Sequence, residues 1–157
     1  MGFDAGKFEQ AAFDYRTQEV DATEVKEFFD EGEKAVFKVR GLDSRELFQA
    51  ESAAMRAGNL TELVKQITGQ DGKKAVNAAL QILGIKEDMP REYVRALHTV
   101  RMGLVDPELA QPQVVKLADT SPALFTRLKT TIDVLSGQGK SPGELSASGT
   151  TRKSKRR

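Results

Sequence analysis

The segment Ala35-Val-Phe-Lys-Val-Arg-Gly-Leu-Asp-Ser-Arg-Glu46 is where the chain changes from strand to helix. Its first part alternates, with the odd-numbered residues of 35–39 apolar on one face, and it stops at Gly41, which predicts a half-buried strand. Asp43 and Glu46 then have the spacing of a capping box, in which a side-chain acceptor at the N-cap and a Glu three residues later begin a helix. From this point onward the chain reads as helix.

The residues after position 42 predict a helical body, residues 43–136. Apolar side chains recur there at spacings of three and four, the period of an amphipathic helix. Capping residues, glycines and prolines divide this pattern. We expect helices at 43–58, 59–67, 71–84, 90–104, 114–118 and 121–137. The expected fold is therefore mainly α, a cluster of about six helices with a small N-terminal β element and a disordered C-terminal tail.

Residues 1–42 predict a smaller N-terminal element of short helices and strands. We expect an amphipathic helix over 7–15, an extended segment over 17–20, and a short helix capped by Thr23 that ends near residue 29. Five carboxylates crowd the same region and predict a solvated acidic face, because their spacing is not that of a calcium loop. They are Glu24, Glu27, Asp30, Glu31 and Glu33.

Phenylalanine is concentrated at the start of the chain. Five of its eight copies are Phe3, Phe8, Phe13, Phe28 and Phe29. One interpretation is that these rings pack the N-terminal element onto the helical body. The other is a surface for a partner or for a second copy of the chain, because apolar patches larger than a few hundred Å² usually mark interfaces. The sequence leaves both interpretations open.

Residues 137–157 predict a disordered basic tail or linker, because they are mostly Gly, Ser, Thr, Pro, Lys and Arg and can bury very little. Residues 136–157 hold six of the 24 basic residues and one of the 23 acidic ones, so the chain before them is acidic. The basic end comprises Arg152, Lys153, Lys155, Arg156 and Arg157. It could contact phosphates. However, it has no aromatic residue for base stacking, and we expect no basic groove on the acidic body, which argues against nucleic acid as the partner.

The residues needed for several kinds of chemistry are missing. The chain has no cysteine and a single histidine, His98, so we expect neither a metal site nor a cofactor. No phosphate-binding or nucleophile motif opens a helix, and we therefore predict a binding protein and not an enzyme. No apolar run approaches the roughly 20 residues that span a bilayer. We expect no membrane contact and a location in the cytosol.

Several stretches in a fixed order resemble a known family. An aromatic-rich start, an extended segment and a short helix ending in Phe28-Phe29 come first. The stretches that follow are Val36-Phe-Lys-Val-Arg-Gly-Leu42, Glu46-Leu-Phe-Gln-Ala-Glu-Ser-Ala-Ala54, Leu83-Gly-Ile85, Val105-Asp-Pro107, Ser121-Pro-Ala-Leu-Phe-Thr-Arg-Leu128 and Leu135-Ser-Gly-Gln-Gly-Lys140. This order, over residues 3–140, resembles the tail assembly chaperones of long-tailed bacteriophages, the group that includes the lambda G protein.

The resemblance implies a viral protein that acts in the cytoplasm of the infected host. Such chaperones are mostly helical, self-associate, coat the long tape measure protein and give way as the major tail protein assembles around it. They are also commonly made in a longer form by a minus-one ribosomal frameshift, which would serve the contact with the major tail protein. Gln138, Gly139 and Lys140 can be encoded as CAG-GGA-AAG, which contains the slippery sequence GGGAAAG. The alternative is that these residues are only linker.

A second class of function fits the same sequence. A small helical protein could bind nucleic acid, or act as a regulator, through the basic C-terminal tail. This alternative predicts binding that weakens steeply with salt and is lost when residues 151–157 are removed.

Overall fold

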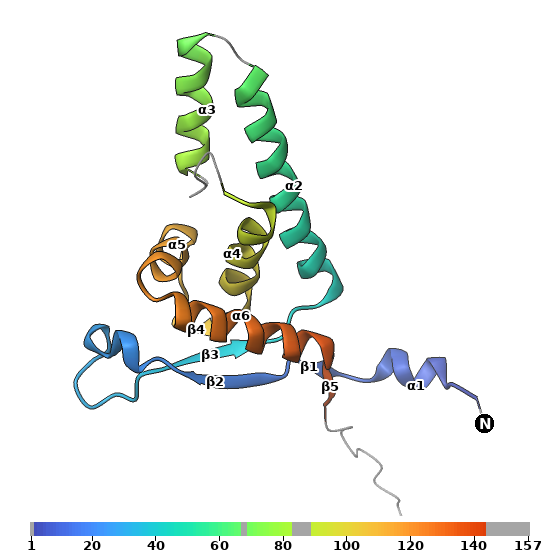
Figure 1. Cartoon of the computed structure of the whole chain (residues 1–157). Coiled ribbons are helices and arrows are strands. Elements are labelled where there is room, and N and C mark those ends of the chain that lie inside the picture. Colours follow the sequence, from blue (N-terminus) through green and yellow to red (C-terminus); the bar gives the residue numbers. More distant parts are fainter. Residues whose placement is uncertain (1, 67–68, 83–88, 144–157) are drawn as a thin grey trace, which may run out of the picture.

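A small antiparallel sheet and the helix that crosses it form the base of the molecule (Figure 1). The computed structural model describes residues 2–66, 69–82 and 89–143. Its elements in chain order are α1 (Ala5–Gln10), β1 (Phe13–Asp14), β2 (Thr17–Asp21), the 3₁₀ helix η1 (Thr23–Phe28), β3 (Val36–Arg40), α2 (Ser44–Gln66), α3 (Gln70–Ile82), α4 (Arg91–Gly103), β4 (Leu104–Asp106), α5 (Gln111–Thr120), α6 (Pro122–Gly137) and β5 (Ser141–Pro142). The predicted mainly α fold with a small β element is confirmed.

The larger sheet has the order β2–β3–β4, and both of its pairings are antiparallel. Strand β3 is central, as its alternating sequence predicts, with Phe37 and Val39 buried on one face. The third strand was not predicted. The predicted helix over 90–104 extends one residue too far, because Leu104 lies opposite Val39 as part of β4. Three residues are too few to show an alternating pattern, so the pairing is what defines this strand.

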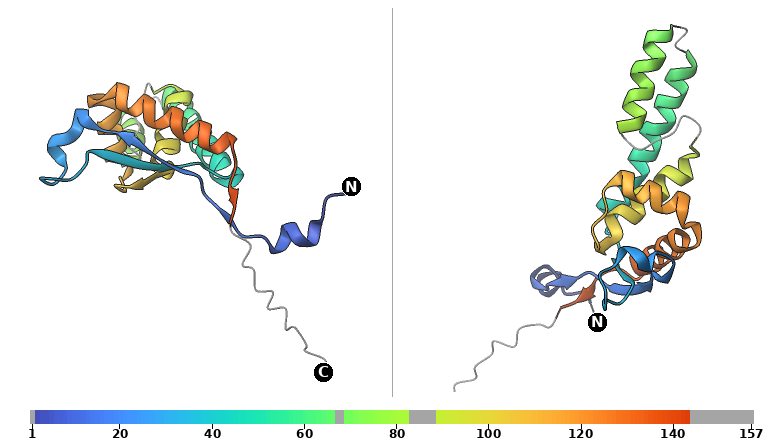
Figure 2. Two further views of the ribbon diagram at one scale, coloured as in Figure 1. Left: turned by 90° about the horizontal axis from the view of Figure 1, so that it is seen from below. Right: turned by 90° about the vertical axis from the view of Figure 1, so that its left-hand side faces the viewer.

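Helix α6 lies across the larger sheet, and the two together hold the main core (Figures 1 and 2). The side chains that α6 turns inward recur at spacings of three and four, and those of Leu124, Leu128 and Ile132 are fully buried. They belong to the same cluster as Phe37 and Val39 of β3. The predicted N-terminal element, residues 1–42, and the predicted body, residues 43–136, therefore build one core.

The junction between β3 and α2 touches the C-terminal end of α6. Gly41 approaches the backbone of Leu135 so closely that an added Cβ would lie 2.7 Å from its carbonyl carbon. Next to it, the N–H of Leu42 donates to the Oγ of Ser136 at 2.8 Å. This close contact sets the position of the sheet against α6, and it requires glycine at position 41.

The capping box that begins α2 is present as predicted. The N–H of Glu46 donates to Asp43, and the N–H of Asp43 donates to Glu46, both at 3.0 Å. Glu46 also accepts two hydrogen bonds from the guanidinium of Arg40, at 2.6 and 2.9 Å, in a partly buried pair. Arg40 is the main cause of the lowered pKa of Glu46. A charge-assisted bidentate pair thus joins the end of β3 to the first turn of α2.

Helix α2 is longer than predicted. It runs without a break from Ser44 to Gln66, so the expected end at Gly58 and the separate helix at 59–67 are wrong. A glycine inside a helix costs only about 1 kcal/mol relative to alanine, and packing outweighs that cost. Among the α2 residues whose burial is described, the buried ones are the small residues Ala50, Ala54 and Ala57, and α4 packs closely against this helix. Helix α3 then runs back beside the far half of α2 (Figure 1).

The N-terminal segment forms an arm at the edge of the base (Figure 1). Helix α1 buries none of its residues and is capped by Asp4, which accepts from the N–H of Lys7 at 3.0 Å. The predicted helix over 7–15 is too long, because Phe13 and Asp14 instead form β1 and pair with β5. Of the residues assigned by sequence to the tail, Gly137 is the last residue of α6, and Ser141 and Pro142 form β5. The rest of that tail lies outside the described residues.

None of the helices within residues 2–66, 69–82 and 89–143 is long and apolar enough to cross a membrane.

Gly41 and Gly58 give a matched pair of alanine substitutions. We expect Gly41→Ala to lower the free energy of unfolding by about 2 kcal/mol or more, because the new Cβ would meet the backbone of Leu135 and Ser136. Gly58→Ala adds the same methyl group inside α2, where nothing lies within 4 Å, and should raise stability by about 0.5–1 kcal/mol. Urea unfolding followed by circular dichroism measures both. Equal effects of the two substitutions would contradict the close contact at Gly41.

Candidate docking groove

A groove of about 1060 Å³ opens between η1, the start of β3, the loop after β4 and α5. Figures 1 and 2 show η1, which lines part of this groove, at the end of the sheet opposite the N-terminal arm. The apolar lining of the groove comes from three separate parts of the chain: Val25, Phe28, Phe29, Val36, Phe37, Pro107, Leu109 and Leu117. A concave, largely apolar surface of this size can accept several side chains of a partner segment.

Two neighbouring phenylalanines take opposite roles at the groove. The 3₁₀ helix ends at Phe28, whose ring is 79% exposed. The next residue, Phe29, has extended backbone angles, which turn its ring inward against Phe37 with the ring centroids 5.8 Å apart. Phe29 therefore packs on the core, while Phe28 offers an open aromatic surface at the groove.

The rim of the groove is acidic. Glu24 is paired with Arg127 at 2.6 Å, and its pKa is lowered by a backbone hydrogen bond and by that arginine. Among the described residues, no ion pair neutralises the other four carboxylates of the lining, which belong to Glu27, Asp30, Glu33 and Asp106. The sequence predicted a solvated acidic face here. Four of its five carboxylates line one side of the groove, so the acidic face borders an apolar surface.

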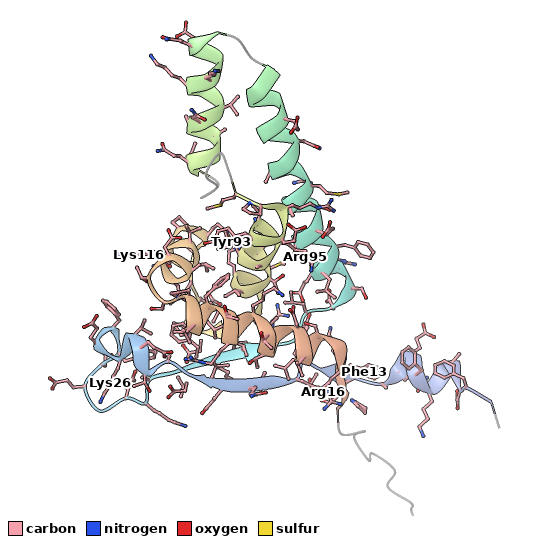
Figure 3. All side chains as sticks on the ribbon, in the orientation of Figure 1. Phe13, Arg16, Lys26, Tyr93, Arg95 and Lys116 are labelled. Carbon is pink, nitrogen blue, oxygen red and sulfur yellow. The ribbon has the colours of Figure 1, made fainter. Side chains whose placement is uncertain are left out.

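Few basic residues offset this charge. Lys34 also lines the groove but is already paired with Glu19 at 3.2 Å. Lys116 projects from α5 on the opposite wall, and Lys26 lies on η1 outside the lining (Figure 3). The groove thus favours a segment that combines apolar side chains with basic ones.

The other three predicted phenylalanines form a separate surface. Phe3, Phe8 and Phe13 stack in a row, with 5.2 Å between the ring centroids of each successive pair. Phe3 and Phe8 are largely exposed, and the row lies on the arm, away from the groove (Figure 3, where Phe13 is labelled). The five phenylalanines grouped by the sequence therefore divide into three on the arm, one exposed at the groove and one packed on the core.

Gln138, Gly139 and Lys140 follow α6 directly. Gly139 has a positive φ of 67°, which suits glycine at the end of a helix. The ammonium group of Lys140 lies 4.0 Å from the centre of the Tyr15 ring, and Arg40 lies 4.2 Å from the same ring. The hydroxyl of Tyr15 donates to Asp43 at 3.0 Å. Lys140 is therefore packed against Tyr15 and Asp43 at the start of α2. The predicted basic end, residues 152–157, lies outside the described residues.

A second hollow, of about 400 Å³, lies between α2 and α4. It is lined by Arg45, Arg56, His98 and Arg101, and no acidic residue lines it. This finding corrects the expectation that the body has no basic groove. The signal was present in the sequence, because Arg45 and Arg56 are 11 residues apart and share one helical face. The contribution of α4 depends on packing, which the sequence does not reveal.

The sequence did not predict the α5 wall of the docking groove, for a similar reason. Leu109 and Leu117 lie more than 70 residues after η1, and the pairing of β4 with β3 together with the packing of α5 on α6 brings them beside it. Within the described ranges, no group of His, Asp and Glu side chains could hold a metal ion. Comparison with known proteins gave no matching family model, no matching curated protein and no matching solved structure.

Truncating Phe28 and Phe29 separates the exposed ring from the packed one. We expect Phe29→Ala to lower the free energy of unfolding by about 2–3 kcal/mol, because it removes the contact with Phe37 and leaves a cavity. Phe28→Ala should change stability by less than about 0.5 kcal/mol, since its ring is mostly in water. Thermal and urea unfolding measure both. A large loss for Phe28→Ala would mean that this ring supports the fold rather than a partner.

Proposed function

We propose that this chain is a tail assembly chaperone of a long-tailed bacteriophage, a binding protein and not an enzyme. Its client is the tape measure protein, which it keeps soluble in the host cytoplasm until the major tail protein assembles. Two lines support the proposal. One is the order of sequence stretches over residues 3–140. The other is the docking groove, an open apolar surface suited to holding part of a helical client.

The observation that carries the proposal is the combination of an apolar lining with an acidic rim. An amphipathic helix presents an apolar stripe with polar side chains on either side. Its apolar stripe would cover Phe28 and the lining around Pro107 and Leu117. Basic side chains beside the stripe would meet Glu27 and Glu33. The groove therefore selects helices whose polar flank is basic, and binding there weakens with added salt.

The row of Phe3, Phe8 and Phe13 gives a surface for self-association, the second interpretation of these rings. The rings are already ordered in a stack, so covering them would cost little side-chain entropy. Because the row lies on the arm and the groove at the opposite end of the sheet, contacts between copies there would leave the groove open to the client (Figure 1).

We also propose that the protein is made in a second, longer form by a minus-one ribosomal frameshift. A slip at codons 138–140 falls after the last residue of α6, so both products would share every element from α1 to α6. The longer one would differ from β5 onward, where a domain that recruits the major tail protein would be joined.

Co-expression tests the chaperone proposal. We expect the tape measure protein of the same phage to move from the insoluble to the soluble fraction when this chain is present, and to co-purify with it. Phe28→Ala should reduce the co-purified amount at least about tenfold, as truncating a central aromatic residue of an interface commonly does. Val134→Ala is the matched control, because Val134 is 54% exposed on α6 and does not line the groove.

The possible results of this experiment distinguish the chaperone function from the assignment of the client to the docking groove. A tape measure protein that stays insoluble with the chain present would contradict the chaperone proposal. Solubility that is restored but unaffected by Phe28→Ala would contradict only the assignment of the client to the groove. Equal losses for Phe28→Ala and Val134→Ala would indicate non-specific contact.

The DNA sequence at codons 138–140 tests the longer product. We expect a heptamer such as GGGAAAG, and a second, larger protein from the same start codon on an immunoblot against the N-terminal arm. Synonymous changes that break the heptamer should abolish the larger protein and leave the short one unchanged. Codons that cannot pair again after a one-base slip would exclude these residues as the site.

A further inference from the structure

The hollow between α2 and α4 has properties that the docking groove lacks. It is lined by side chains of α2 and α4, and none of its lining residues comes from η1 or α5. We call its residues Arg45, Phe48, Arg56, His98, Arg101 and Met102 the arginine face. The proposed function does not use this surface.

Within the described ranges the arginines of this face form no ion pair, although Glu108 lines a neighbouring hollow together with Arg101. No ion pair joins Arg45, Arg56 or Arg101 to a carboxylate. By contrast, Glu51 of α2 forms ion pairs with Arg91 and Arg95 of α4, so other arginines of the same two helices do have a carboxylate partner (Figure 3, where Arg95 is labelled). The three guanidinium groups of the arginine face are therefore available to pair with the carboxylates of a bound ligand.

Burial and the neighbouring charge of Arg101 lower the pKa of His98. The imidazole is therefore mostly neutral near pH 7, and the three guanidinium groups supply the charge of the face. A guanidinium presents a planar fork of donors that matches a carboxylate in a bidentate pair. The chemistry of the face is thus that of a carboxylate receptor.

The same face is also apolar at its centre. Phe48 lies between Arg45 and Arg56 on α2, and 75% of its surface is exposed. Met102 is half-buried beside it on α4. A large exposed ring between arginines is typical of interface centres, where aromatic residues and arginine are enriched.

The spacing of these groups matches a helical ligand. Arg45 and Arg56 are 11 residues apart, three turns of α2, so their backbones lie roughly 16 Å apart along one face. A helix laid against α2 and α4 can place carboxylates at the same interval and an apolar residue between them. A nucleic-acid strand would use the guanidinium groups, but would find only one aromatic ring on which to stack.

We propose that the arginine face binds an acidic amphipathic helix of a partner protein. Carboxylates of that helix pair with Arg45, Arg56 and Arg101, and its apolar residues cover Phe48 and Met102. The chain then has two docking surfaces of opposite charge, and it can hold a basic helical segment and an acidic one at the same time.

Fluorescence anisotropy with synthetic peptides tests this proposal. The probe is a labelled amphipathic peptide of about 18 residues, with Leu on one face and Glu on both flanks. A second peptide carries Gln at each Glu position, and a single-stranded DNA of about 12 nucleotides provides the nucleic-acid arm. At about 50 mM salt we expect the Glu peptide to bind at least about tenfold more tightly than the Gln peptide.

Matched variants test whether the Glu peptide binds at the arginine face. Arg45→Gln combined with Arg101→Gln should weaken binding of the Glu peptide about tenfold, and Phe48→Ser should weaken it by a similar factor. Lys38→Gln combined with Lys73→Gln removes the same charge from exposed positions outside the face and should leave binding unchanged. Far-UV circular dichroism verifies that each variant is folded.

Three results would overturn the proposal. The first is no binding of the Glu peptide to the unaltered chain. The second is an equal loss in the arginine and lysine double variants, which would mean that net charge alone attracts the peptide. The third is DNA that binds more tightly than the Glu peptide and loses affinity in the arginine variant, which would assign the face to nucleic acid.

Discussion

The contact between the β3–α2 junction and the end of α6 is the constraint on which the other elements depend. At Gly41 the chain passes directly over the backbone of Leu135, and the N–H of Leu42 reaches Ser136. This contact joins residues more than 90 positions apart in the chain. It fixes the sheet under α6, and the paired charges of Arg40 and Glu46 then set the direction in which α2 leaves the sheet.

The docking groove is a consequence of this arrangement. Once β3 is fixed under α6, β4 can pair with its free edge, and the loop that follows carries Pro107 and Leu109 toward η1. The two walls of the groove are thus far apart in sequence. They are joined through the central strand and through α6, which packs against α5 and pairs Arg127 with Glu24 of η1.

Local signals in the sequence were sufficient for some elements and not for others. The capping box of Asp43 and Glu46, the alternation in β3 and the apolar stripe of α6 are each encoded within a few residues. The merging of two expected helices at Gly58 and the strand at 104–106 depend on distant partners, α4 and β3 respectively. Of the site, the acidic rim and Phe28 were visible in the sequence. The α5 wall and the gathering of Arg45 with Arg101 were not, because they arise only when the helices pack.

The pairing of β1 with β5 has a practical consequence for handling the protein. It brings residue 13 beside residue 142, so the N-terminal arm and the last described residues lie at the same corner of the sheet (Figure 2). The groove faces outward from the opposite end of the sheet. A surface tether attached through the N-terminal arm would therefore leave the groove on the side of the molecule away from the support.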